Sequence, residues 1–190
     1  MKTWEDRIED YEWETGFPKS LFIADDGRVV GTWILGNDYR VKSDFYGGYP
    51  NTYLRRVKSL FRDKTRVLHL FSGKVDTTLM PGDTVDADVT LDPTYLDDAQ
   101  TLEKVPLEKY DLVMCDPPYS IEDAMHYAPG MVKRTKVMRA LARLRPGAHV
   151  VWLDQVLPQW RKDVFALDGL VGIVRSTNHR FRVMVIFRRL

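Results

Sequence analysis

The sequence predicts a single α/β domain whose sheet is mainly parallel and ends in an antiparallel hairpin. From residue 66 onward, apolar strand-like runs alternate with helical segments, which is typical of a parallel sheet. Near the C-terminus, the apolar runs 170–176 and 180–189 surround the polar segment 177–179 and therefore indicate a hairpin. The 190 residues suffice for one domain with a real core and are too few for two comfortable ones.

Residues 1–50 are expected to form an extension in front of a core that covers 51–190. Segment 21–35 has two apolar runs around an Asp-Gly pair, which favours a hairpin. Segment 36–50 is polar, aromatic and glycine-rich, so it predicts a long loop. Apolar residues at helical spacing predict a helix over 51–61, with Asn51 as its N-cap.

Strands and helices of the core follow from apolar runs and their periodicity. Strands are expected at 66–71, 83–88, 95–102, 110–115 and 148–154, and helices at 131–144 and 158–166. Only residues 74–83 separate the first of these strands from the second. A crossover helix needs at least that length, so the first helix is expected to be abbreviated.

The charge is uneven although the formal net charge is only +1. Residues 1–16 are acidic, whereas 133–145 and 175–190 carry bases and no acid. Two such segments suggest a polyanionic partner, and ordinary solvated faces are the alternative. The candidate nucleic-acid contacts are Lys133, Arg134, Lys136, Arg139, Asn178, His179 and Arg180.

The sequence shows no membrane-span or signal-peptide pattern and has a single cysteine. No apolar run approaches the ~20 residues of a membrane span, and the first residues lack the apolar core of a signal peptide. Cys115 is the only cysteine, which excludes an internal disulfide and a cysteine metal cluster. A cytoplasmic setting is therefore expected, and no metal is.

Four features follow successive strands of the predicted sheet. They are a glycine at Gly73, an acid at Asp86, an acid at Asp98 and the tetrapeptide Asp-Pro-Pro-Tyr at 116–119. Ligands of open α/β sheets bind at the carboxyl ends of the strands, where a glycine permits close approach and an acid can bind ribose hydroxyls. The order of these features predicts a nucleotide-like cofactor there.

With these motifs, residues 66–190 resemble the amino-methyltransferases that use S-adenosylmethionine and carry a D-P-P-Y signature after the fourth strand. The resemblance implies a Rossmann-like class I methyltransferase sheet and S-adenosylmethionine as cofactor. It also implies cofactor contacts by a set of residues at these strand ends: His69, Phe71, Gly73, Asp86, Asp98, Ala99 and Asp116. Two positions depart from the family pattern, because His69 replaces an acid and Val75 replaces a second glycine.

The tetrapeptide suits methyl transfer to an amino group. The nitrogen of a base amino group is a poor nucleophile because its lone pair is delocalised. Two acceptors, the carboxylate of Asp116 and the carbonyl of Pro117, would favour its pyramidal form in the transition state. Pro118 stiffens the turn, and Tyr119 offers a ring on which the base can stack. Such a transfer needs neither a metal nor a protein nucleophile, so Cys115 is interpreted as structural.

The sequence therefore predicts a DNA adenine-N6 methyltransferase that acts on a base flipped out of a duplex. An RNA adenine-N6 or guanine-N2 methyltransferase stays open, as does a catalytically silent subunit that pairs with an active enzyme. The chain has no space for a separate target-recognition domain of the usual size. Residues 1–50, a homodimer or a partner subunit could then read the target, and loop 45–50 either contacts nucleic acid or covers the cofactor.

Overall fold

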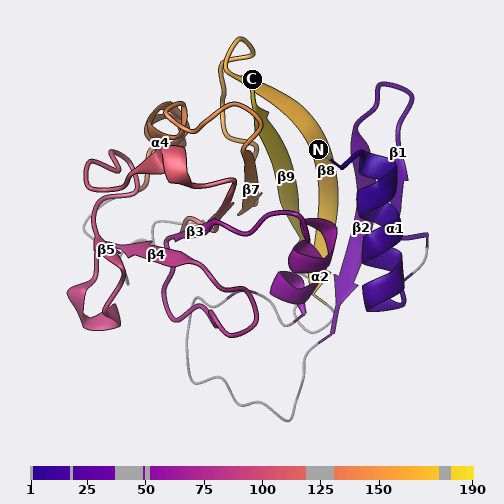
Figure 1. Ribbon diagram of the computed structural model, residues 1–190, viewed down its shortest axis with the longest axis horizontal. Coiled ribbons are helices and arrows are strands. Elements are labelled where there is room, and N and C mark those ends of the chain that lie inside the picture. Colours follow the sequence, from indigo (N-terminus) through magenta and orange to yellow (C-terminus); the bar gives the residue numbers. More distant parts are fainter. Residues whose placement is uncertain (1, 18, 37–48, 50–51, 119–130, 176–180) are drawn as a thin grey trace.

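The computed structural model describes residues 2–17, 19–36, 49, 52–118, 131–175 and 181–190 (Figure 1). Within them, nine strands form one sheet in the order β1-β2-β8-β9-β7-β6-β3-β4-β5. The strands are β1 (Leu21–Ile23), β2 (Val29–Leu35), β3 (Val67–Leu70), β4 (Asp83–Asp86), β5 (Tyr95–Leu96), β6 (Leu112–Cys115), β7 (His149–Asp154), β8 (Phe165–Arg175) and β9 (Phe181–Arg189). The helices are α1 (Trp4–Thr15), α2 (Tyr53–Leu60) and α4 (Arg134–Leu141), with 3-10 turns η1 (Val89–Leu91) and η2 (Leu107–Lys109).

The chain reverses its direction of winding between β3 and β6. Strand β3 pairs in parallel with β4 on one side and with β6 on the other. Strand β5 extends the first side, and β7 extends the second in parallel with β6. Such a reversal opens a crevice at the carboxyl ends of the two central strands, so the fold itself points to the edge where a ligand binds.

An antiparallel hairpin closes the sheet, as the sequence predicted. Strand β9 lies between β7 and β8 and is antiparallel to both. The N-terminal hairpin then adds β2 in parallel to β8, with β1 antiparallel at the edge. The carboxyl ends of β2, β6, β7 and β8 therefore share one edge of the sheet with those of β3 and β4.

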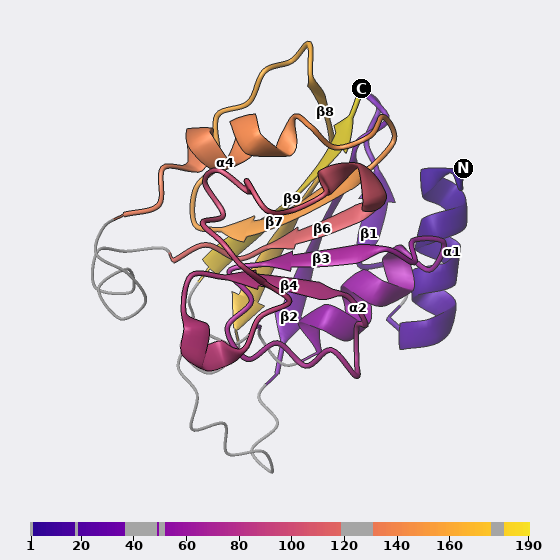
Figure 2. The same cartoon turned by 60° about the vertical axis from the view of Figure 1, so that its left-hand side comes forward.

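Helices cover both faces of the sheet, α4 on one and α1 with α2 on the other (Figure 2). Successive side chains of β6 point to opposite faces of the sheet, so the strand contributes to both hydrophobic cores. Val113 and Cys115 belong to the cluster on the α4 face, whereas Leu112 and Met114 belong to the cluster on the α1 and α2 face. Continuous burial of all four residues is what a strand covered on both sides requires.

Helix α1 is the element that the sequence did not predict. Thr3 and Asp6 form a capping box, in which each side chain accepts a hydrogen bond from the other residue's backbone N–H, at 3.2 and 3.0 Å. Arg7 is 1% exposed and donates to both carboxylate oxygens of Asp63, at 2.5 and 2.8 Å, and to the carbonyl of Leu60. The acids of 1–16 therefore belong to a docked helix, which is anchored by one buried arginine.

Three other expectations can be compared with the structure. Residues 71–82 contain no helix, so the abbreviated first crossover is confirmed. The helix expected over 158–166 is wrong, because the chain forms turns there and Phe165 pairs with Arg189 as the first residue of β8. Helix α2 begins at Tyr53, and Thr52 rather than Asn51 takes the N-cap position, with a positive φ of 67° and no side-chain hydrogen bond. Within the described ranges, none of the helices could cross a membrane.

Candidate functional site

The loop after β3 is tied to the end of β4 by an acid that the sequence singled out. Asp86 accepts hydrogen bonds from the backbone N–H of Gly73, at 2.9 Å, and of Asp88, at 3.1 Å. Phe71 has a φ of +54° and Gly73 a φ of +51°. The left-handed region is sparsely populated by residues other than glycine, and such residues concentrate at functional sites. Asp86 and two residues of positive φ therefore fix the shape of this loop at the carboxyl edge.

Asp98 and Ala99 lie in the turn that follows β5. The Asp98 carboxylate accepts from the backbone N–H of Gln100 at 2.8 Å, so this side chain caps its own turn. Asp98 is exposed and Ala99 is buried. Gln100 in turn accepts from the backbone N–H of Lys133 at 3.0 Å, which joins this corner to the segment before α4.

His69 occupies the position where the family pattern has an acid, and its side chain is committed to the core. It is fully buried, and Nε2 lies 3.0 Å from the carbonyl oxygen of Met80. Burial lowers the pKa of His69, so the ring is neutral and donates from Nε2 to that carbonyl. The histidine thus fixes the segment before β4 against β3 where a helix would normally do so.

The D-P-P-Y tetrapeptide begins directly after β6, the strand beside the switch point. Cys115 is buried, Asp116 is half-buried and Pro117 is buried again. Burial first, and then the charge of Asp116, raises the pKa of the Cys115 thiol well above its ordinary value. A thiol held neutral in this way is no nucleophile, which agrees with its structural interpretation. Tyr119 lies outside the described residues.

Two tyrosines, which the sequence predicts only as parts of a loop and a helix, are in contact with each other. Tyr49 and Tyr53 stack with ring centroids 5.5 Å apart and planes 13° apart. Burial raises the pKa of both phenols, and the charge of Asp116 is the second cause. Both phenols are therefore neutral at ordinary pH.

A buried ion pair at the end of β7 was also missed. Asp154 is fully buried and accepts from Arg134 at 2.7 and 3.1 Å, and from the indole of Trp152 at 3.1 Å. The pair holds the start of α4 against the carboxyl edge. An acid that ends an apolar strand, with a basic helix just before that strand, was the available signal.

The predicted nucleic-acid contacts differ in whether their charge is already paired within the protein. Lys133, Lys136 and Arg139 are exposed, whereas the guanidinium of Arg134 is engaged by Asp154. A phosphate contact by Arg134 would have to compete with a buried carboxylate, so it is the weakest of these candidates. Asn178, His179 and Arg180 lie outside the described residues.

Comparison with known proteins gives a result at the level of the fold. No family model matches the chain, and no curated protein does. Among solved structures, a complex of Mtq2 and Trm112 from E. cuniculi, responsible for methylation of the termination factor eRF1, is 14% identical, with 77% of this chain and 99% of that chain covered and a TM-score of 0.51. This chain has a class I methyltransferase fold.

Two other structures share the general shape. The N-methyltransferase NodS from Bradyrhizobium japonicum WM9, in complex with S-adenosyl-L-homocysteine, is 12% identical, with 73% and 84% coverage and a TM-score of 0.49. An rRNA methylase from Streptococcus thermophilus is 12% identical, with 67% and 88% coverage and a TM-score of 0.45. Likenesses of this degree concern the methyltransferase fold and not the substrate.

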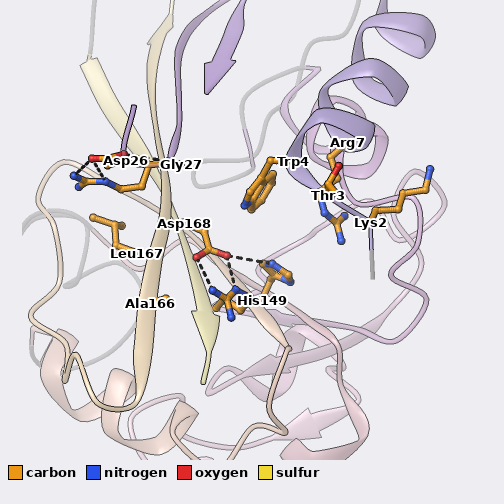
Figure 3. Close-up of a pocket in the computed structure, with 12 residues that line it drawn as sticks. Lys2, Thr3, Trp4, Arg7, Asp26, Gly27, His149, Ala166, Leu167 and Asp168 are labelled. Carbon is orange, nitrogen blue, oxygen red and sulfur yellow. Dashed lines mark hydrogen bonds and ion pairs between the residues drawn. The ribbon is translucent and has the colours of Figure 1, made fainter. Parts of the chain in front are cut away.

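A pocket of about 450 Å³ lies at the opposite, amino edge of this methyltransferase sheet (Figure 3). The charged side chains that line it have partners of opposite charge. Arg188 donates to Asp168 at 2.8 Å, the Nε2 of His149 lies 3.7 Å from the same carboxylate, and Trp4 packs edge-on against the His149 ring. The D-P-P-Y segment and the loop after β3 are at the other ends of these strands, so the candidate active site is the carboxyl edge and not this pocket.

Proposed function

We propose that the chain transfers a methyl group from S-adenosylmethionine to the exocyclic amino group of adenine in DNA. The observation that supports this most is the place of Asp116 and Pro117, at the carboxyl end of the strand beside the switch point of a methyltransferase fold. A stability argument does not account for a half-buried acid followed by two prolines at that point.

The roles of the two residues follow from their hydrogen-bonding groups. The Asp116 carboxylate accepts one N–H of the target amino group, and the Pro117 carbonyl accepts the other. Both interactions strengthen as the nitrogen becomes pyramidal, so they stabilise the transition state more than the ground state. The ring of Pro117 fixes its φ, which keeps the carbonyl aimed without further ordering.

The described residues fit the cofactor. S-adenosylmethionine supplies an electrophilic methyl group on a cationic sulfur when it is bound. Each carboxylate oxygen of Asp86 accepts one backbone hydrogen bond, and a carboxylate has about four lone-pair sites, so Asp86 retains acceptor capacity for ribose hydroxyls. Asp98 is exposed at the neighbouring strand end and supplies a second acceptor for the adenine.

A nucleic-acid partner is supported by the exposed bases of α4. Lys133 and Lys136 carry charges free of the Asp154 pair, on the helix whose start contacts the carboxyl edge. Phosphate contacts make log affinity fall with log salt by about 0.9 per contact. Replacing both lysines by alanine should therefore flatten the slope of DNA binding by up to about two units, while a parental slope would mean that both are merely solvated.

The chemical identity of the product tests the proposal. Unmethylated DNA and RNA are incubated separately with labelled S-adenosylmethionine, digested to nucleosides and separated. N6-methyldeoxyadenosine is the expected product. Labelled N6-methyladenosine or N2-methylguanosine from RNA would replace the DNA substrate by RNA. Cofactor binding without any labelled nucleoside would favour the silent-subunit alternative. That alternative is considered because His69 stands where the family pattern has an acid.

A further inference from the structure

Strands β2, β8 and β9 bury one of their faces and leave much of the other open. On the α1 and α2 face, Trp33 and Val171 are fully buried. On the opposite face, Ile34 is 66% exposed, Phe181 is 63% exposed, and Phe22 of the edge strand β1 is 55% exposed. Apolar side chains on both faces are typical of strands that are covered on both sides, so the second face lacks a cover.

Strand pairing joins these residues into one patch, which we call the open-sheet patch. Three rows of paired residues cross the strands on this face: Phe22, Val30 and Leu170; then Thr32, Gly172 and Val183; then Ile34, Val174 and Phe181. None of these side chains is charged. The Phe181 ring lies over Gly172, because a Cβ at that glycine would stand only 3.1 Å from two carbons of the ring. The patch is therefore a continuous apolar surface across four strands.

The connection from β7 to β8 explains why the open-sheet patch has no cover. Both strands are antiparallel to β9, so they are parallel to each other. A connection between parallel strands usually contains a helix that packs on the sheet, but residues 155–164 form turns and extended chain. Helix α4 lies beside β7 and away from β1 and β2 (Figure 1). Leu170 and Val183 still pack against the core beneath α4, and the cover ends beyond them.

The size of the open-sheet patch indicates what would cover it. Four strands 4.8 Å apart and three rows about 6.8 Å apart span roughly 19 by 20 Å, or about 400 Å² in projection. A single helix is about 10–12 Å wide and would cover only half of that width. Two such patches face to face bury about 800 Å² in projection and more in accessible surface, which is close to the ~1,000 Å² of a small specific interface. Another sheet of the same width therefore fits better than a helix.

We propose that the open-sheet patches of two copies of this chain pack face to face and form a two-fold symmetric dimer. A second copy presents an uncharged surface of the same extent, so the nine residues of each patch bring no charge into the contact. Stacked sheets pack about 10 Å apart with their strands aligned within about 30°, which would cover Phe22, Ile34 and Phe181 of both copies. This inference concerns assembly and does not rest on the methyl transfer proposed above.

The association state of the full chain tests the inference. Sedimentation velocity over about 1 to 500 µM should show the parent protein passing from monomer to dimer, because a contact of this size is expected to be weak. Ile34→Lys and Phe181→Lys should each raise the dissociation constant by about 100-fold or more, since every dimer would then bury two unpaired charges. Trp13→Lys is the matched control. Trp13 is 86% exposed on α1, which packs on the other face of the sheet, so this variant should dimerise like the parent protein.

Cross-linking distinguishes this contact from any other dimer. Thr32 is exposed in the middle row of the open-sheet patch, so Thr32→Cys should link two copies through a bismaleimide about 10 Å long, whereas Trp13→Cys should not. Cys115 is buried and should not react. Thermal unfolding of dilute, monomeric samples checks that the lysine variants are folded. A parent protein that stays monomeric over the whole range would overturn the inference, and so would a dimer that both lysine variants retain or that Thr32→Cys fails to link.

Discussion

The two edges of the sheet differ in how their buried polar groups are paired. At the amino edge the ions pair with one another, as Arg7 does with Asp63 and Arg188 with Asp168. At the carboxyl edge the phenols of Tyr49 and Tyr53 are buried without a partner among the described residues. His149 is the exception at the amino edge, where its Nδ1 is unpaired although its Nε2 faces Asp168. The carboxyl edge therefore combines one buried ion pair, Arg134 with Asp154, with unpaired buried hydroxyls that cost stability.

The largest effect is expected at the carboxyl edge, from Asp116→Ala. It removes an acceptor that acts mainly in the transition state, so methyl transfer should fall by about 10³-fold while the affinity for S-adenosylmethionine stays within a few-fold. Single-turnover kinetics and calorimetry separate these two quantities. Full turnover by the variant would remove Asp116 from the mechanism.

The largest effect at the amino edge is expected on stability, from Arg7→Ala. The change leaves Asp63 and the carbonyl of Leu60 without their donor, and it removes the guanidinium that lies 5.1 Å from the centre of the Phe61 ring. Breaking a largely buried pair should lower the free energy of unfolding by roughly 3 kcal/mol, measured by urea denaturation. A loss of cofactor affinity in the still-folded variant would contradict the claim that the amino edge affects stability and not cofactor binding.

A smaller effect is expected from acidification, because two histidines are buried. Burial lowers the pKa of His69 and of His149 below the ordinary value of about 6.5. The unfolded chain therefore binds more protons than the folded chain below that pH, so stability should decline as the pH falls from 7 toward 5. His69→Gln keeps a donor for the Met80 carbonyl and cannot titrate in this range, so it should show a shallower decline. An unchanged decline would assign the pH dependence to other groups.

Carboxylates add a second decline at lower pH. Burial alone would raise the pKa of Asp168, but the nearby His149 ring and the hydrogen bonds from Arg188 outweigh it and lower the pKa. A carboxylate with a lowered pKa stabilises the fold above its ordinary pKa of about 4, and this contribution is lost as the pH falls further. The two declines should thus be separable in a series of urea titrations.

Periodicity and strand-end chemistry predicted the sheet and its ligand edge. Uninterrupted apolar runs such as Leu112–Cys115 are buried on both sides, and this leaves little ambiguity about the strand. The helix expected over 158–166 failed because Phe165 pairs with Arg189 in a long antiparallel ladder. Pairing between strands distant in sequence overrides local propensity, and no local pattern records it.

Long-range partners account for what was missed at the site. Arg134 was grouped with the exposed bases because its charge is visible in the sequence, whereas its partner Asp154 lies 20 residues away on another element. Arg7 was counted within an acidic stretch, although Asp63 makes it the anchor of α1. Tyr49 and Tyr53 stack on each other in the fold, and no pattern in the sequence records that contact.

Binding of S-adenosylmethionine by matched variants of the two edges tests the central claim most directly. Asp86→Ala removes the acid that holds the loop after β3, and Asp26→Ala removes an exposed acid that lines the amino-edge pocket. Calorimetry should show binding by the parent protein, a loss of about 1.5–3 kcal/mol for Asp86→Ala, and no change for Asp26→Ala. Unchanged affinity in Asp86→Ala, together with weakened binding in Asp26→Ala, would place the cofactor at the amino edge and contradict the account.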